Sequence, residues 1–193
     1  MDKKLLLVAL FFTIPLSLFA SPFGLKMGMT LEQITEVCGR TRPEHYENDS
    51  YFIEPINKHP LFKYYLVYID KEIGLYYIKA LTDEISSNDY GEEIKSAFEN
   101  IKDRISKNYG KPKVIDELAR DTLWNEEKYW LNALQEGSRT LAAAWGVEKP
   151  IDKDDIEFIG ITARYSSYKK GIILLEYQFK NYSEIEDSQD SVF

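Results

Sequence analysis

The chain has 193 residues and a formal net charge of −8, from 24 basic and 32 acidic side chains. A surface of this sign repels phosphate groups, so nucleic acids and anionic lipids are poor partner candidates. A single cysteine, Cys38, excludes an internal disulfide, and the fold must therefore be stabilised by the packing of its own core.

The first predicted element is an export signal at residues 1–20. Two lysines precede an almost unbroken apolar run at 5–19, and Ala20 supplies the small residue that a signal peptidase requires. A membrane anchor that stays attached is the alternative, but this run is shorter than the roughly 20 residues that cross a bilayer. We therefore expect cleavage before Ser21, no stable membrane anchor afterwards, and a periplasmic or secreted protein.

The residues after the export signal predict one domain. Residues 21–183 are enough to bury a core, and residues 184–193 form an acidic tail that we expect to be solvated. Removing the signal takes away two basic residues and one acidic residue, which shifts the net charge to −9. Nucleic acid therefore remains excluded as a partner of the mature chain.

A short helix is predicted after Thr30. This residue is a hydroxyl N-cap, Gln33 completes a capping box three residues later, and Gly39 ends the helix. Cys38 falls on the apolar side of the helix, and no histidine is its immediate neighbour in the sequence. We therefore expect a buried small hydrophobic residue rather than a nucleophile.

Three strands are predicted next, at residues 51–54, 62–70 and 75–81. The second and third strands are rich in tyrosine, valine, isoleucine and leucine, which favour strands. Residues 71–74 separate them and end in a glycine, which suits a hairpin turn.

The strongest helix pattern starts at a cap formed by Asn88 or Asp89 and stops at Gly110 and Pro112. Its apolar side chains share one stripe and its charged side chains cover the opposite side. One face of this helix should therefore pack on a sheet. The stripe consists of Ile94, Ala97, Phe98, Ile101, Ile105 and Tyr109.

The remainder predicts a strand at 114–118, a helix at 126–134, a strand at 140–147, and a hairpin of strands at 156–166 and 172–180. Every second residue of the hairpin strands is apolar, and we expect these two apolar faces to meet in the core. They are formed by Ile159, Ile161, Ala163 and Tyr165 in one strand and by Ile173, Leu175, Tyr177 and Phe179 in the other.

The order of these elements predicts an α+β fold with a mostly antiparallel sheet, packed by one long amphipathic helix and shorter helices. The strands are connected too tightly for parallel crossovers. A helix followed by an aromatic hairpin occurs at residues 30–81 and again, loosely, at 92–180. This succession indicates a weak pseudo-repeat of a helix plus a hairpin.

Residues 23–34 read Phe-Gly-Leu-Lys-Met-Gly-Met-Thr-Leu-Glu-Gln-Ile, in which a Gly-Met-Thr turn starts a helix, and Gly39 follows. This stretch resembles the opening of the SmpA/OmlA-type outer-membrane assembly modules and of the β-lactamase inhibitor protein fold. The resemblance covers about twenty residues and implies an exported α+β module that binds other proteins. The chain departs from the lipoproteins in lacking a cysteine directly after the apolar run.

No nucleophile elbow, phosphate-binding glycine loop or cysteine–histidine pair occurs, so no catalytic residue and no cofactor are predicted. His45 has acidic neighbours but lacks the second well-spaced strong ligand of a metal site, and we expect a solvated loop there and no metal. Carboxylates are plentiful, and a pair of facing acids stays open as an alternative because such pairs are defined by their separation in space.

Tyrosine is frequent, with fourteen in the chain and five of them in the hairpin at 62–81. Strand alternation sends these side chains to both faces of the sheet, so one set belongs to the core and the other is available to a partner. A second layer over that face, such as the C-terminal segment, is the alternative. The candidate binding residues are Tyr65, Tyr77 and Glu176, the last being an acid on the far face of an apolar strand.

These features predict an exported binding or interaction protein of the cell envelope or periplasm that acts without catalysis on a protein or small ligand. The alternative is an extracytoplasmic hydrolase that depends on carboxylates. The two differ in geometry, because the hydrolase needs two facing acids in a concave pocket, whereas the binding protein needs an open aromatic face.

Overall fold

The computed structural model describes residues 21–185, so the predicted export signal and residues 186–193 of the acidic tail lie outside the described residues. The helices are α1 (Leu31–Val37), α2 (Glu92–Tyr109) and α3 (Trp130–Gln135), with 3-10 turns η1 (Pro22–Gly24) and η2 (Glu127–Tyr129). The strands are β1 (Glu44–His45), β2 (Ser50–Ile53), β3 (Phe62–Asp70), β4 (Gly74–Thr82), β5 (Ile85–Ser86), β6 (Lys113–Leu118), β7 (Arg139–Trp145), β8 (Ile156–Ser167) and β9 (Lys170–Phe179). Across this part of the chain, no helix is long and apolar enough to cross a membrane.

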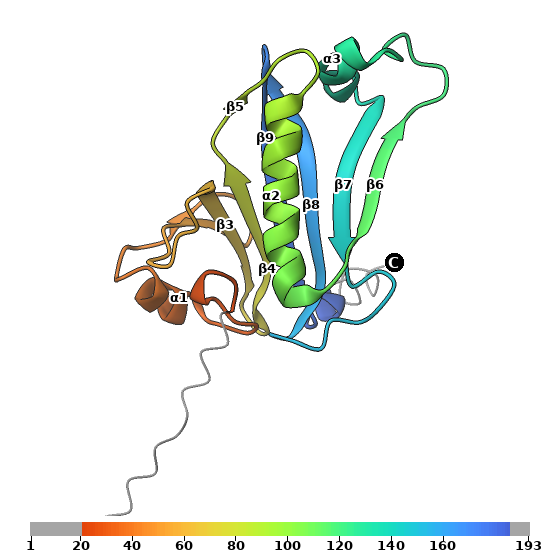
Figure 1. Ribbon diagram of the computed structural model, residues 1–193. Coiled ribbons are helices and arrows are strands. Elements are labelled where there is room, and N and C mark those ends of the chain that lie inside the picture. The colour runs from red at the N-terminus through yellow and green to blue at the C-terminus, as the bar shows by residue number, and fades with distance from the viewer. Residues whose placement is uncertain (1–20, 186–193) are drawn as a thin grey trace, which may run out of the picture.

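The nine strands form one antiparallel sheet in the order β1-β2-β3-β4-β9-β8-β7-β6, and β5 also pairs with β9. Helix α2 lies across the front of the sheet (Figure 1). The predicted α+β fold with a mostly antiparallel sheet and one long helix is confirmed.

The sheet consists of two four-stranded meanders that meet at its centre. Along the chain, α1 precedes the meander β1 to β4, and α2 precedes the meander β6 to β9. Each meander starts at an edge of the sheet and runs inward, so its last strand is central. The two last strands, β4 and β9, pair with each other and place Ile78 opposite Tyr177. The repeated unit is thus a helix followed by four strands, which is larger than the predicted helix plus hairpin.

The start of α1 has the predicted capping box. The Thr30 side chain accepts a hydrogen bond from the Gln33 N–H, and the Gln33 side-chain oxygen accepts one from the Thr30 N–H at 3.0 Å. Cys38 follows as the C-cap and is 3 % exposed, in agreement with its predicted burial. Burial raises the pKa of its thiol above the ordinary value, so the neutral thiol is favoured.

Helix α2 begins after Gly91 rather than at the predicted cap. Gly91 is the N-cap and has left-handed backbone (φ 72°), while the Asn88 side-chain oxygen accepts a hydrogen bond from the Glu92 N–H at 3.3 Å. A turn closed by the Gly91 N–H and the Asn88 carbonyl separates these residues. Glycine is needed because a Cβ here would lie 2.0 Å from Cε3 of Trp130.

Other boundaries also differ from the sequence prediction. The predicted helix at 126–134 is divided into η2 and α3. The predicted strand at 140–147 ends at Trp145, because Gly146 turns the chain with a φ of 91°. The two-residue strands β1 and β5 have no counterpart in the prediction, since two residues are too short for a periodic pattern.

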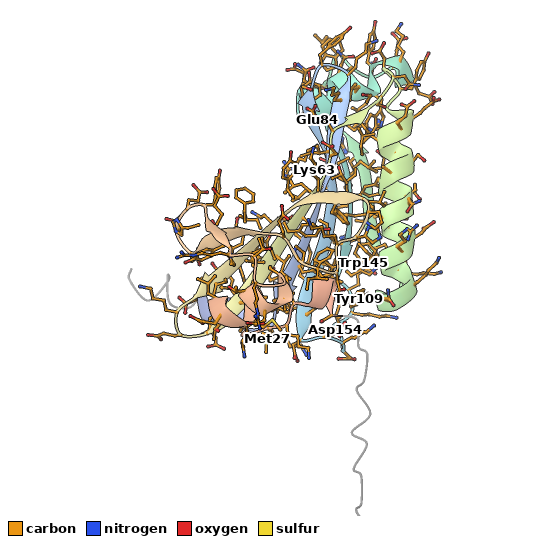
Figure 2. The ribbon with its side chains drawn as sticks, turned by 90° about the vertical axis from the view of Figure 1, so that its left-hand side faces the viewer. Met27, Lys63, Glu84, Tyr109, Trp145 and Asp154 are labelled. Atoms are coloured by element: carbon orange, nitrogen blue, oxygen red, sulfur yellow. The ribbon has the colours of Figure 1, made fainter. Side chains whose placement is uncertain are left out.

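One face of the sheet carries the core. The apolar stripe of α2 packs on this face, and Phe98 and the central residues Ile161, Ile173 and Phe179 are 0 % exposed. The predicted meeting of the two hairpin faces in the core is therefore confirmed for these strands. Tyr165 at the end of β8 is only partly buried. Helix α2 runs along one side of the long strands β8 and β9 (Figure 2).

A β-bulge near the start of β4 changes the alternation of its tyrosines. Tyr68 pairs with Tyr77 and the next residue, Ile69, pairs with Leu75, which leaves Tyr76 as the extra residue of the bulge. The Tyr76 ring lies 6.2 Å from the Tyr68 ring, so Tyr76 joins Tyr77 beside the same neighbour. Simple alternation would have placed these two adjacent side chains on opposite faces.

Candidate functional site

The sheet face opposite α2 is called here the open sheet face, and its centre is formed by Tyr68 of β3, Tyr77 and Lys79 of β4, and Glu176 and Gln178 of β9. Strand register brings these residues together, because Tyr68 is opposite Tyr77, Tyr77 is opposite Gln178, and Lys79 is opposite Glu176. All five side chains are half-buried. The two central strands of the sheet therefore present aromatic, cationic and anionic groups side by side.

Two polar contacts fix this cluster. The Tyr77 hydroxyl donates a hydrogen bond to Glu176 Oε1 at 2.5 Å. Lys79 Nζ donates to the Tyr68 hydroxyl at 3.2 Å and lies 5.2 Å and 5.3 Å from the ring centres of Tyr68 and Tyr77. Burial, followed by the hydrogen bond to Glu176, raises the pKa of Tyr77 far above its ordinary value. Tyr77 is therefore a neutral donor to the Glu176 side chain.

The end of the described chain adds a further tyrosine to the open sheet face. The Asn181 side-chain amide donates to the carbonyls of Ile73 and Leu75 at 3.1 Å and 3.2 Å, which ties the C-terminal turn to the start of β4. Tyr182 then lies with its ring 5.9 Å from the Tyr76 ring and 5.8 Å from the Tyr77 ring. The C-terminal segment thus contributes Tyr182 to the cover of this face, beside Tyr76 and Tyr77.

The structure brings together two of the three predicted binding residues. Tyr77 and Glu176 share the open sheet face and a hydrogen bond. Tyr65 does not belong to this surface, because it is opposite Ala80 on the core side of the sheet and is 1 % exposed. The sequence prediction missed Lys79 and Tyr182, for which no local pattern provides a signal. The hydrogen-bond partner of Lys79, Tyr68, comes from a different strand, and Tyr182 lies beyond the last strand.

Tyr65 instead supports the loop between β2 and β3. Its hydroxyl accepts a hydrogen bond from the His59 N–H at 3.0 Å and lies 3.3 Å from the His59 carbonyl oxygen. Burial raises the pKa of the Tyr65 phenol, so it remains protonated. A buried tyrosine in this place holds a polar loop against the apolar core.

Substitution of Tyr65 by phenylalanine is expected to lower the free energy of unfolding by about 1 kcal/mol, because the half-buried His59 N–H loses its acceptor. Urea denaturation followed by circular dichroism measures the change. The matched control is Tyr168→Phe at a side chain that is 81 % exposed, for which we expect a change within roughly 0.5 kcal/mol. Equal effects of the two substitutions would contradict the role assigned to the Tyr65 hydroxyl.

Among residues 21–185, no group of three or more histidine, cysteine or acidic side chains is arranged to hold a metal ion. His45 Nε2 lies 2.9 Å from the Asn48 carbonyl oxygen, and the His45 ring packs edge-on against Tyr51 at 5.2 Å. His45 is exposed but belongs to the short strand β1, not to the predicted loop. Within the described residues, the acidic neighbours of His45 in the sequence do not form a set of metal ligands with it.

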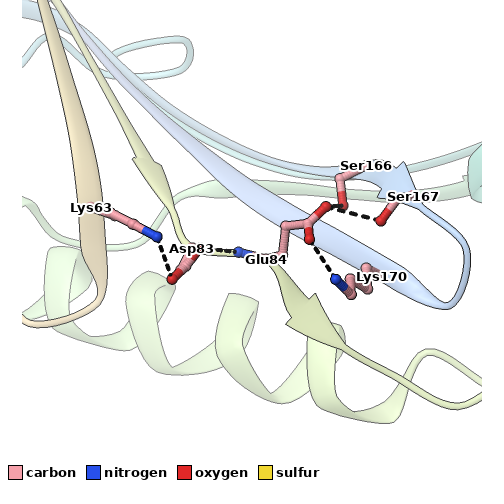
Figure 3. Close-up of polar contacts among 6 residues, drawn as sticks. All are labelled: Lys63, Asp83, Glu84, Ser166, Ser167 and Lys170. Atoms are coloured by element: carbon pink, nitrogen blue, oxygen red, sulfur yellow. Dashed lines mark hydrogen bonds and ion pairs between the residues drawn. The ribbon is translucent and has the colours of Figure 1, made fainter.

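A second polar cluster joins the ends of the two meanders (Figure 3). Glu84 accepts hydrogen bonds from the hydroxyls of Ser166 and Ser167 at 3.1 Å and 2.9 Å and from Lys170 Nζ at 2.7 Å. Lys63 Nζ lies 2.8 Å from Asp83 Oδ2 in the same region. These contacts lower the pKa of both carboxyls, so they stay ionised. Each carboxylate of the cluster is paired with a lysine, and all four charged side chains are solvent-exposed. The cluster therefore links the surface ends of the strands and is not a candidate binding site.

Comparison with protein-family models, with curated proteins and with solved structures gives no match.

Proposed function

We propose that the chain is exported, is cleaved before Ser21, and acts in the periplasm or outside the cell as a non-enzymatic binding protein that holds a partner protein on its open sheet face. The observation that carries this proposal is the cluster of tyrosines with one lysine and one carboxylate at the centre of the sheet face opposite α2. The export step rests on the sequence of residues 1–20.

The composition of this face suits a protein partner. Half-buried apolar side chains, among them Leu81, Phe158 and Leu174, flank the polar centre on neighbouring strands. Tyrosine combines a large apolar ring with a polar hydroxyl, and such residues are enriched where proteins meet. The side chains stand on strands rather than loops and are held by mutual contacts, so little conformational freedom is lost on binding.

The contacts of Glu176 favour binding over the hydrolase alternative. A glycosidase-like pair needs a second carboxyl group facing the first across roughly 5–10 Å of space that admits a substrate. The nearest partner of Glu176 is instead the hydroxyl of Tyr77, and its cross-strand neighbours are Lys79 and Gly160. This arrangement fixes the carboxylate as a hydrogen-bond acceptor on a surface.

Site-specific photo-crosslinking tests the proposal in cells that express the full-length chain. A benzophenone side chain at Gln178, on the open sheet face, is expected to form a discrete adduct with a partner protein, whereas the same group at Asp103, on the exposed side of α2, is not. The Glu176→Lys substitution is expected to reduce the Gln178 adduct about tenfold or more, because it inverts a charge in the contact surface. Mass spectrometry of the recovered chain should give Ser21 as its first residue.

The matched control is Glu99→Lys, which makes the same charge change on the exposed side of α2 and should leave the adduct intact. Adducts that form equally from Gln178 and Asp103, or that survive Glu176→Lys, would overturn the assignment of the open sheet face. A recovered chain that keeps residues 1–20 would overturn the cleavage step alone.

A further inference from the structure

The helix-covered side of the molecule contains a groove of about 560 Å³ at the junction of its two halves. One wall comes from the first half, namely the N-terminal turn η1 and the loop at 57–62. The other wall is the C-terminal half of α2, and the central strand β9 forms the floor. A volume of this size lies in the usual range of small-molecule sites, which often occur where two structural units meet. The groove is on the opposite side of the sheet from the open sheet face.

The floor of the groove is apolar and well packed. It is lined by Leu175 and Tyr177 of β9, by Ile101 and Ile105 of α2, and by Phe62 of β3, all of which are less than 9 % exposed. The wall next to it contains Phe23, whose ring packs edge-on against those of Phe62, Tyr65 and Tyr177 at 6.1, 4.8 and 6.2 Å. An apolar body fits this surface, because binding removes carbon surface from water on both sides.

The backbone of η1 is strained to build that wall. Phe23 has left-handed backbone (φ 58°), which a bulky side chain rarely adopts and which costs on the order of 1 kcal/mol. The aromatic contacts of its ring offset this strain. The wall is therefore formed in the protein as it stands and does not depend on a ligand to order it.

The cationic side chains that line the groove are Lys58 and Arg104. Lys58 and His59 stand on one rim and Arg104 on the other, and no aspartate or glutamate lines the groove, although the chain carries a net charge of −8. Two acids lie just behind the lining. Glu54 is 3.1 Å from Lys58 Nζ, and Asp154 accepts a hydrogen bond from the Tyr109 hydroxyl at 2.9 Å. Because Glu54 pairs with Lys58 itself, the positive charge that faces the groove comes mainly from Arg104.

Arg104 and His59 both have donors to offer. Arg104 Nε donates to the Asn100 side chain at 2.7 Å, and within residues 21–185 its two terminal nitrogens have no protein partner. His59 Nδ1 accepts a hydrogen bond from the Leu61 N–H at 3.3 Å, which places the ring proton on Nε2. Burial, followed by the charge of Arg104, lowers the pKa of His59, so the ring is a neutral donor at pH 7. A bound anion would accept from both groups.

We infer that this groove binds a small molecule with an apolar body and one anionic head group, with the body on the β9 floor and the head between Arg104 and the Lys58–His59 rim. Ser21 also lines the groove. If the proposed cleavage occurs, the new α-amino group at Ser21 adds a further positive charge at the same end. The groove itself does not depend on that step.

Isothermal titration of the protein purified after expression of the full-length chain tests the inference. The probes share a ten-carbon chain and differ in their head groups: decanoate, decyl phosphate, decanol and decyltrimethylammonium, each below its micelle concentration. We expect at least one of the two anions to bind roughly tenfold or more tightly than decanol, and the cation to bind more weakly still. The ranking of decanoate against decyl phosphate distinguishes a carboxylate from a phosphate ligand.

Variants locate the binding. Arg104→Met keeps the aliphatic stem but removes the charge and should weaken anion binding about tenfold without changing decanol binding. Arg120→Met, at an exposed arginine outside the groove, is the matched control and should have no effect. Asn108→Trp fills the groove from an exposed helix position and should abolish binding of every probe. These variants leave the open sheet face untouched, so the crosslinking result is independent of this test.

Three results would overturn the inference: decanol binding as tightly as both anions, Arg104→Met retaining full anion affinity, or binding that survives Asn108→Trp. A chain that binds none of the four probes would equally overturn it. The far-ultraviolet circular dichroism and melting temperature of each variant exclude a loss of binding through unfolding.

Discussion

Replacing Phe98 by alanine is expected to lower the free energy of unfolding by about 3–5 kcal/mol. Phe98 stands in the middle of α2, is 0 % exposed, and belongs to the core that the helix forms with the sheet. Its removal leaves a cavity between two rigid layers, neither of which can collapse freely to fill it. Thermal unfolding should show a decrease in Tm on the order of 10 °C.

The control for this substitution is Glu99→Ala at the next position of the same helix, where the side chain is exposed. Its effect should stay within roughly 0.5 kcal/mol, because an exposed helical residue contributes little beyond propensity. A Phe98→Ala variant as stable as this control would contradict the packing of α2 on the sheet. The shape of the groove beside α2 should also change, because Ile101 and Ile105 of the same apolar stripe line it.

Replacing Gly91 by alanine is expected to destabilise the protein by about 3 kcal/mol. Two effects add at this position: left-handed backbone, with a φ of 72°, and a Cβ that would lie 2.0 Å from the Trp130 ring. The ring cannot move away easily, because Trp130 is 2 % exposed and has Lys95 Nζ and Arg139 Cζ at 4.8 Å and 5.7 Å from its centre. Guanidinium denaturation measures the loss.

Gly137 separates the two effects. It has nearly the same backbone, with a φ of 69°, but nothing lies within 4 Å of its Cβ position. Gly137→Ala should therefore cost only the backbone strain of about 1 kcal/mol. The difference between the two variants measures the contact between Gly91 and Trp130. If the two substitutions cost the same, Trp130 does not lie against the start of α2.

Much of the fold can be predicted from local patterns. The stripe Ile94 to Tyr109 and the alternating strands β8 and β9 were assignable because apolar side chains repeat with the period of the element that buries them. Local patterns fail where a contact with a distant residue determines the boundary of an element. Gly91 rather than Asn88 starts α2 because Trp130, far along the chain, occupies the space beside it. No local pattern records that contact.

In the candidate site, too, local patterns identify single residues, whereas the contacts between them depend on distant parts of the chain. Tyr77 and Glu176 can each be recognised as polar residues on the far side of an apolar strand, but their hydrogen bond depends on the pairing of β4 with β9. Tyr65 was misplaced among the binding residues because a tyrosine in a strand gives no signal of which face is core. The groove is even harder to predict from the sequence, because its walls and floor come from four separate stretches of the chain.

The pairing of β4 with β9 has a consequence for the order in which the protein folds. The two strands are brought together across almost the whole domain, and the Tyr77–Glu176 hydrogen bond alone spans 99 residues. Closing so long a loop precedes any gain from the central contacts, so the sheet should form slowly and only once β9 is available. Until then β4 has a bare edge, which is open to pairing with other chains. If the chain is exported as proposed, with its N-terminus first, it should stay unfolded until its last strand has crossed the membrane, and it should need protection from aggregation during that interval.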